Sequence, residues 1–201
     1  MTHVTPNVEL PVGSIGRHAN GWWGMIMLIA TEAALFGYLL FAYYYLAVQH
    51  RPDWLPARLP GFTFSIPNSI ILIVTTVLAW RADKTLSEGA GPGVVAIHLL
   101  VITLLGAIFI ALQVDEWSGQ TFMVSTGAFG SLYYTLTAAH VLHVAAGVLM
   151  MGALTLWTAL GYFDRTRTSY VSIGALYWYF IFVVWLALFF TFYISPRLSV
   201  G

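Results

Sequence analysis

The stretch WWGMIMLIATEAALFGYLLFAYYYLAV, residues 22–48, decides the fold class. It runs for 27 residues and contains one acidic residue, Glu32, and no basic residue. A helix of about 20 consecutive apolar residues crosses the hydrocarbon core of a bilayer. The stretch is therefore long enough to span a membrane as a helix, and Glu32 lies ten residues past Trp22, well inside that span.

The composition of the whole chain also indicates a protein that is surrounded by lipid. The 201 residues are 59% hydrophobic and 8% charged, whereas a soluble domain carries about 25% charged residues. Eight basic and eight acidic residues are scattered singly and give a net charge of zero, so no nucleic-acid-binding surface is expected. The absence of cysteine excludes disulfides, thiolate metal sites and cysteine nucleophiles.

Four further apolar segments follow the first, at about 64–80, 94–114, 127–160 and 170–195. Only helices and closed barrels satisfy the backbone in lipid, and barrel strands alternate over about ten residues, which these continuous runs do not. We therefore predict an all-α polytopic membrane protein, with five transmembrane helices in a bundle over residues 21–197. Residues 1–20 are polar, lack the apolar core of a signal peptide, and are predicted to form a flexible tail.

The distribution of basic residues predicts the orientation of the bundle. Lys and Arg in short loops favour the cytoplasmic side of a membrane. The side that holds the N-terminus carries five of them, and the opposite side carries three; they are Arg17, Arg81, Lys84, Arg165 and Arg167 against Arg51, Arg58 and Arg197. This bias predicts a cytoplasmic N-terminus and an external C-terminus.

Polar groups inside the spans are the candidate functional residues. A carboxylate at mid-bilayer costs at least ~3 kcal/mol, so Glu32 needs a partner or a function. The stretch TLTAAHVLHVAAG, residues 135–147, places His140 and His143 three residues apart, on nearly the same face of a helix. Counted from the middle of each span, Glu32 and His143 fall within about 5 Å of the same depth. An imidazole beside Glu32 would offset the cost of its charge or share a proton with it.

Three other interpretations of the histidines remain open. Two histidines and a carboxylate match the ligands of a facial-triad metal site, but the other candidate ligand, His98, lies near the cytoplasmic end of its own span. A haem b site requires histidines on two facing helices. The histidines could instead hydrogen-bond to hydroxyls such as those of Thr135 and Thr137 and fix helix packing. A polar cluster around Glu32 is the preferred interpretation.

Other features receive structural interpretations. Asp115 and Glu116 follow the third span and are expected to be solvated. The aromatic stretch LYWYFIFVVW, residues 176–185, is expected to face lipid or a partner, and Gly127 and Gly130 are expected to allow close helix approach. Aromatic residues near span ends are typical interface anchors; they include Tyr43 and Trp54. Interhelical hydrogen bonds are expected from Asn68, Thr75, Thr76 and Gln113.

Three segments together resemble subunit III of the haem-copper oxidases. They are GWWGMIMLIATEAALFGYLLFAYYY (21–45), ALQVDEWSGQTFMVSTGAFGSLYYTLTAAHVLHVAAG (111–147) and ALYWYFIFVVWLALFFTFYI (175–194). The order, the spacing and the loop lengths are similar to those of that family from about residue 20 onward. The most specific parts are the glutamate in ATEAALF, the QxxEW run, and the GS(x)nHxxHVxxG pattern.

The resemblance implies an integral membrane subunit that binds no haem or copper itself. It would flank the catalytic subunit I, which reduces O2 to water while moving protons, and assemble with subunits I and II. Cytochrome c would be an indirect partner, and ordered phospholipids would occupy a cleft between the first two helices and the rest. Glu32 corresponds to the family's intramembrane acid, His140 and His143 to its HxxH pair, and Glu116 to the acid of its external loop.

The five-helix form resembles the short bacterial versions of the family, and the last helix departs from it. The family's last helix usually reads YWHFVDxVW. This chain has Tyr179 in place of the histidine and Phe182 in place of the aspartate. We predict subunit III of a bacterial cytochrome c oxidase in the plasma (inner) membrane, without redox catalysis of its own. The alternatives are subunit III of a quinol oxidase, a subunit-III-like protein of a nitric oxide reductase, a haem-binding anchor, or a small proton or ion channel or transporter.

Overall fold

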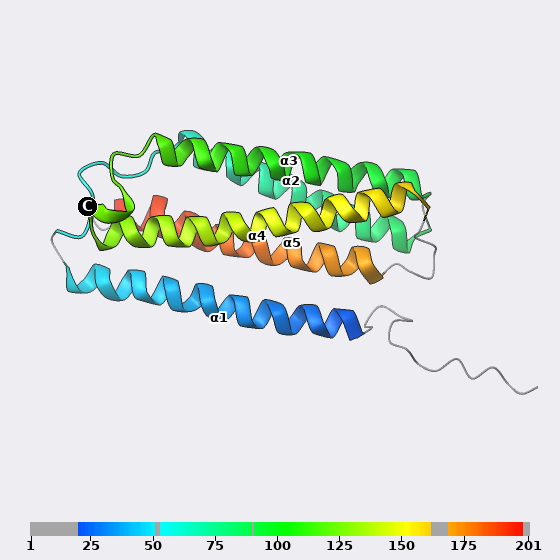
Figure 1. The fold of residues 1–201 in the computed structure, drawn as a ribbon, viewed down its shortest axis with the longest axis horizontal. Coiled ribbons are helices and arrows are strands. Elements are labelled where there is room, and N and C mark those ends of the chain that lie inside the picture. Colours follow the sequence, from blue (N-terminus) through cyan, green and yellow to red (C-terminus); the bar gives the residue numbers. More distant parts are fainter. Residues whose placement is uncertain (1–19, 51–52, 90, 162–168, 199–201) are drawn as a thin grey trace, which may run out of the picture.

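The computed structural model describes residues 20–50, 53–89, 91–161 and 169–198. Within these ranges the protein is all-helical without a strand, and five helices are long and apolar enough to cross a membrane. The predicted fold class is thereby confirmed (Figure 1). The tail at 1–20, apart from Asn20, lies outside the described residues. So do four of the arginines used for orientation, namely Arg17, Arg51, Arg165 and Arg167.

The first four predicted spans each lie on one long helix, and the fifth, at 170–195, covers the last long helix and continues into the segments that follow it. The helices are α1 (Asn20–Gln49), α2 (Phe62–Ser87), α3 (Pro92–Ser118), α4 (Ala128–Ala159) and α5 (Ser169–Phe189). A 3₁₀ turn, η1 (Val124–Thr126), precedes α4, and a π-helical segment, η2 (Phe190–Ile194), joins α5 to the short α6 (Ser195–Leu198). Several helices extend into polar sequence, because backbone hydrogen bonding continues after the apolar run has ended.

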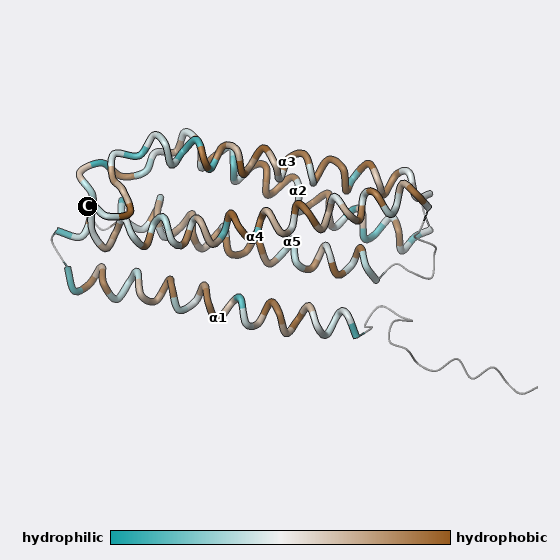
Figure 2. Tube along the Cα trace, viewed as in Figure 1, coloured by the Kyte–Doolittle hydropathy of each residue, from teal (hydrophilic) through white to brown (hydrophobic). Residues whose placement is uncertain are grey.

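The helices form a bundle in which α5 is the most buried span and α1 the least. α4 and α5 lie between α1 on one side and the α2–α3 pair on the other (Figure 1), and α1 packs against α4 and α5. Hydrophobic residues run along the middle of the bundle and hydrophilic residues gather toward its two ends (Figure 2). This distribution matches a protein whose middle is surrounded by hydrocarbon and whose ends meet water.

The aromatic stretch 176–185 faces the interior of the bundle, so the prediction that it faces lipid or a partner was wrong. Trp178 and Trp185 are 0% and 1% exposed. Their indole nitrogens donate hydrogen bonds to α2, at 3.0 Å to Thr75 Oγ1 and 2.9 Å to Ser69 Oγ. A buried indole N–H needs an acceptor, and the hydroxyls of α2 supply one for each tryptophan.

Small residues on two neighbouring helices make room for the Trp178 ring. A Cβ atom built on Gly106 of α3 or on Gly147 of α4 would lie 3.0 Å from a carbon of that ring. In membranes, where no hydrophobic effect drives helices together, close packing over small residues is a main source of helix association. α5 is therefore held centrally by one large ring, two glycines and the hydroxyl of Thr75.

The two glycines near the start of α4 allow the preceding loop to pack closely against this helix. Gly127 has a φ of 145°, a backbone conformation that favours glycine, and begins α4 as its N-cap. A Cβ atom on Gly130 would lie 2.3 Å from the backbone oxygen of Met123. The close approach predicted for Gly130 therefore exists, but its partner is the loop before α4, and no second helix is involved.

Replacing Gly130 by alanine should destabilise the protein by about 1–3 kcal/mol, because the carbonyl that meets the new Cβ belongs to the backbone and cannot rotate away. The free energy of unfolding in detergent measures the effect. Gly37→Ala is the matched control, since a Cβ there meets nothing within 4 Å. Equal unfolding free energies for the two variants would contradict the prediction, because they would show that the loop before α4 can move aside without loss of stability.

Candidate functional site

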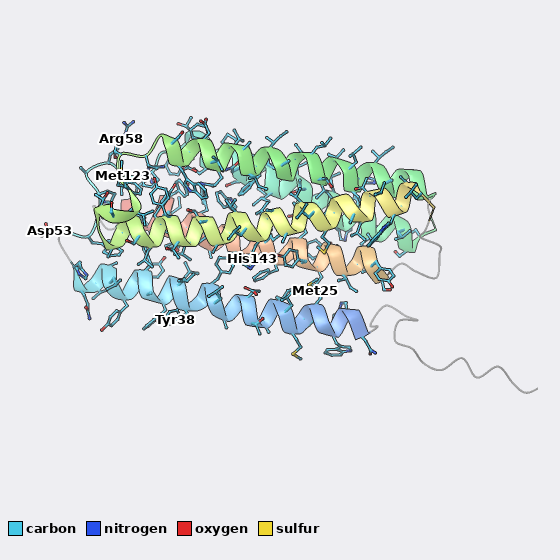
Figure 3. All side chains as sticks on the ribbon, in the orientation of Figure 1. Met25, Tyr38, Asp53, Arg58, Met123 and His143 are labelled. Atoms are coloured by element: carbon cyan, nitrogen blue, oxygen red, sulfur yellow. The ribbon has the colours of Figure 1, made fainter. Side chains whose placement is uncertain are left out.

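Glu32 of α1 and His143 of α4 form a direct contact across the helix interface. Glu32 Oε2 lies 3.0 Å from His143 Nε2, and the two side chains are 28% and 17% exposed, respectively. Figure 3 shows His143 in the space between α1 and the α4–α5 pair. The contact predicted from equal depth in the two spans is therefore present.

The hydrogen bonds of His143 fix the number of protons that the pair holds. Its Nδ1 lies 2.7 Å from the backbone oxygen of Ala139. A carbonyl can only accept, so Nδ1 carries a proton. The contact with Glu32 then needs one more proton between Nε2 and Oε2. It belongs either to an imidazolium facing a carboxylate or to a carboxylic acid facing a neutral imidazole, and both states have zero net charge.

Three aromatic side chains surround this pair. The rings of Phe36 and Phe180 lie with their centroids 5.1 Å and 6.4 Å from the His143 ring. The hydroxyl of Tyr177 donates a hydrogen bond to the backbone oxygen of His143 at 3.2 Å. Tyr177 was missed at the level of sequence, because one tyrosine in a run of aromatic residues carries no signal of its own.

His140 does not join the pair, although the sequence predicted that both histidines could face Glu32. It is 1% exposed, and its Nε2 donates to the backbone oxygen of Ile181 at 3.1 Å. Three residues correspond to 300° around a helix, so His140 is turned 60° from His143 and meets α5. The helix-packing interpretation therefore describes His140, with an α5 carbonyl as its partner. Thr137 bonds to Tyr133 and Trp117 instead.

The arrangement offers no histidine–carboxylate cluster of the kind that a metal needs. Among the described residues, no group of three or more His, Cys, Asp or Glu side chains lies together in a way that could hold an ion. His98 bonds through Nδ1 to Val94 of its own helix at 2.8 Å. What the site can do chemically is hold one proton at the Glu32–His143 contact and join α1 to α4.

Glu116 is buried in the last turn of α3, so the expectation that it is solvated was wrong. It is 3% exposed. Its Oε1 accepts a hydrogen bond from Tyr193 at 2.6 Å, and its Oε2 accepts one from Gln113 at 3.0 Å. The apolar run ends at residue 114, but α3 continues through Ser118 and turns this side chain toward η2. Asp115, the preceding residue, is exposed as expected.

The predictions made for the other polar residues have different outcomes. Asn68 and Gln113 hydrogen-bond between α2 and α3 at 3.4 Å, and Thr75 accepts from Trp178, so these interhelical predictions are confirmed. Thr76 Oγ1 is buried and has no hydrogen-bond partner among the described residues. Two supposed interface anchors belong to the core; Tyr43 and Trp54 are 2% and 7% exposed.

The fold and the site together define a multi-pass helical membrane protein whose outermost helix is joined to the bundle by an intramembrane acid–imidazole pair. The sequence model of a family described as "Cytochrome c oxidase subunit III" matches residues 17–196. The chain belongs to the cytochrome c oxidase subunit III family. Members of this family are accessory subunits of an oxidoreductase complex.

Relatives from distant organisms carry the same name, cytochrome c oxidase subunit 3. The protein of Synechocystis sp. is 31% identical over 176 residues, which cover 86% of this chain and 74% of that protein. The protein of Myxine glutinosa is 32% identical over 178 residues, and that of Danio rerio 31% over 179 residues. Both of these alignments cover 85% of this chain and 68% of the relative.

Proposed function

We propose that the chain is the non-catalytic subunit III of a bacterial haem-copper terminal oxidase of the cytochrome c oxidase type. Subunits I and II would be its partners in the bacterial plasma membrane, with the N-terminus cytoplasmic. Haem and copper would be held by those subunits, and cytochrome c would deliver electrons to them. Family membership and the similarity to the Synechocystis protein support this assignment.

The Glu32–His143 contact carries the proposal for what this chain contributes. Because a carboxylate in the hydrocarbon region is costly, an unpaired Glu32 would disfavour insertion of α1. The imidazole removes that cost while leaving one movable proton near the surface of the bundle. The pair therefore fixes α1 in the assembly and supplies a group that can exchange a proton with the catalytic subunit or with bound lipid.

Purification from native membranes tests the assignment. A tagged chain should copurify with a haem-copper subunit I as its main partner, identified by mass spectrometry. Tyr179 and Phe182 lie where the usual pattern has polar residues, which favours a divergent branch of the family. The sequence of the copurified partner therefore also decides between the oxidase types. A nitric oxide reductase or quinol oxidase catalytic subunit in its place would replace the cytochrome c oxidase assignment.

Replacing Glu32 by glutamine should leave the haem spectrum of the purified complex unchanged and shorten the period over which it sustains oxygen consumption. The amide keeps the volume but cannot form an ion pair with His143 or transfer its proton. Glu88→Gln, the same change at an exposed acid paired with Lys84, is the matched control. A Glu32→Gln complex that lacks haem would contradict the supporting role, because it would place Glu32 in cofactor assembly.

The candidates of other classes predict properties of the purified chain alone. A channel or transporter in which Glu32 relays protons would acidify proteoliposomes under a potential, and Glu32→Gln would abolish the flux. A haem-binding anchor would show a Soret band. The accessory subunit is expected to show neither property.

A further inference from the structure

A second acid–base contact, between Tyr193 of η2 and Glu116 of α3, lies apart from the Glu32–His143 pair. The two side chains are 1% and 3% exposed. The phenol donates to Glu116 Oε1 at 2.6 Å, and Gln113 donates to Oε2 at 3.0 Å. Because both oxygens accept, the arrangement is that of an ionised carboxylate, and a hydroxyl donates to such a group at this short distance. The contact therefore joins a phenol to a base that can take its proton.

This base distinguishes Tyr193 from other tyrosines of the bundle. Loss of one electron turns a phenol into a strong acid, so the oxidation is easier when a base in hydrogen-bond contact takes the proton at once. Tyr134 and Tyr177 donate to backbone carbonyl oxygens, which do not take up a proton near neutral pH. An electron should therefore leave Tyr193 more readily than it leaves either of these two residues.

Tyr193 is connected to the exposed surface of the bundle through Tyr44 of α1. Tyr44 is 39% exposed, and its hydroxyl lies 3.1 Å from the hydroxyl of Thr191, which is two residues before Tyr193 in η2. A second connection runs through aromatic rings. The ring centroid of Tyr43 lies 5.2 Å from that of Tyr44 and 5.2 Å from that of Phe192, the residue next to Tyr193. Because these groups are nearly in contact, an electron can pass from the buried phenol to the exposed one.

We propose that Tyr193 is a redox-active tyrosine that removes organic peroxyl radicals from the surrounding lipid, with Glu116 as its base. A peroxyl radical takes a hydrogen atom from Tyr44 and becomes a hydroperoxide. The Tyr44 radical then takes an electron from Tyr193 and a proton from water, which restores the Tyr44 phenol. The proton of Tyr193 passes to Glu116, so the products are a neutral tyrosyl radical and a carboxylic acid. This role needs no particular type of oxidase as the partner.

Electron paramagnetic resonance of the purified full chain in lipid vesicles tests the proposal. A lipid-soluble azo compound, which generates peroxyl radicals on warming in air, supplies the oxidant, and samples are frozen at intervals. The wild-type chain should give a tyrosyl signal that is absent from Tyr193→Phe. Glu116→Gln should slow the formation of this signal by roughly 100-fold, the low end of the effect of a general base. Tyr134→Phe, which removes a hydroxyl bonded to backbone oxygens, is the matched control and should keep the signal.

A measurement on the wild-type chain keeps the test valid even if Glu116→Gln does not fold. Because a proton moves together with the electron, deuterated water should slow the formation of the tyrosyl signal. A signal that persists in Tyr193→Phe would overturn the proposal, as would a folded Glu116→Gln chain that forms the signal at the wild-type rate. The absence of any tyrosyl signal from the wild-type chain, or equal rates in ordinary and deuterated water, would overturn it as well.

Discussion

Replacing Trp178 by alanine should lower the free energy of unfolding by about 3–5 kcal/mol, the range seen for large aromatic side chains removed from protein cores. The ring is 0% exposed and packs over Gly106 and Gly147, so its removal leaves a cavity between three helices. It also leaves the hydroxyl of Thr75 without its donor. Unfolding in mixed detergent measures the change, when it is monitored by the circular dichroism of the helical backbone and not by tryptophan fluorescence.

Two further variants separate the causes. Trp178→Phe keeps most of the packing and loses the hydrogen bond, so it should cost about 1 kcal/mol from that bond plus a smaller packing loss. Trp23→Ala removes an exposed tryptophan of α1, 55% accessible, and should have little effect in detergent. If Trp178→Ala were no more destabilising than Trp23→Ala, the described packing of α5 in the centre of the bundle would be wrong.

Removing either member of the Glu32–His143 pair should loosen α1, and removing both should cost less than the sum of the single changes. Directly contacting residues show coupling energies of about 0.5–3 kcal/mol in double-mutant cycles. We expect a value in the upper half of this range for Glu32→Gln with His143→Gln, because the contact lies among aromatic rings between helices. Protection of α1 from proteolysis or hydrogen exchange reports on the docking of this helix.

The second histidine provides the control cycle. His140 bonds to Ile181 of α5, whereas the contact of Glu32 is with His143, so Glu32→Gln and His140→Gln should be additive within about 0.5 kcal/mol. Strong coupling in this cycle would indicate that both imidazoles share the carboxyl, as the sequence alone suggested.

The number of helices and the central contact could be predicted from sequence, because both depend on length along the helix axis. Runs of 20 or more apolar residues define the spans, and counting at 1.5 Å per residue placed Glu32 and His143 at one depth. Glu32 was a strong signal because it is the one acidic residue deep inside a span.

The orientation of side chains around each helix could not be predicted in the same way. In a membrane protein both the lipid-facing and the core-facing sides of a helix are apolar, so periodicity does not reveal which face is buried. The interior position of Trp178 and the turn of His140 toward α5 follow from partners on other helices, namely Thr75 and Ile181. The hydroxyl side chains of α2, which include Ser69 and Thr75, were the feature of the sequence that could have indicated buried partners for the tryptophans.

The π-helical segment η2 was also beyond prediction, and it decides the surroundings of Glu116. Its wider turn directs Tyr193 toward Glu116 of α3 and Thr191 toward Tyr44 of α1, at 2.6 Å and 3.1 Å. Such segments insert one residue into an α-helix and frequently occur at functional sites. No residue type in FTFYI marks this change, because it depends on the contacts that α3 and α1 offer.

Nitrogen-15 NMR of histidine-labelled protein in lipid bilayers tests the shared proton between α1 and α4 most directly. We predict that His143 Nδ1 is protonated and that Nε2 shows a hydrogen bond, which disappears in Glu32→Ala while the signals of His140 stay in place. Unchanged His143 signals in Glu32→Ala, or a shift confined to His140, would show that no proton is shared between Glu32 and His143.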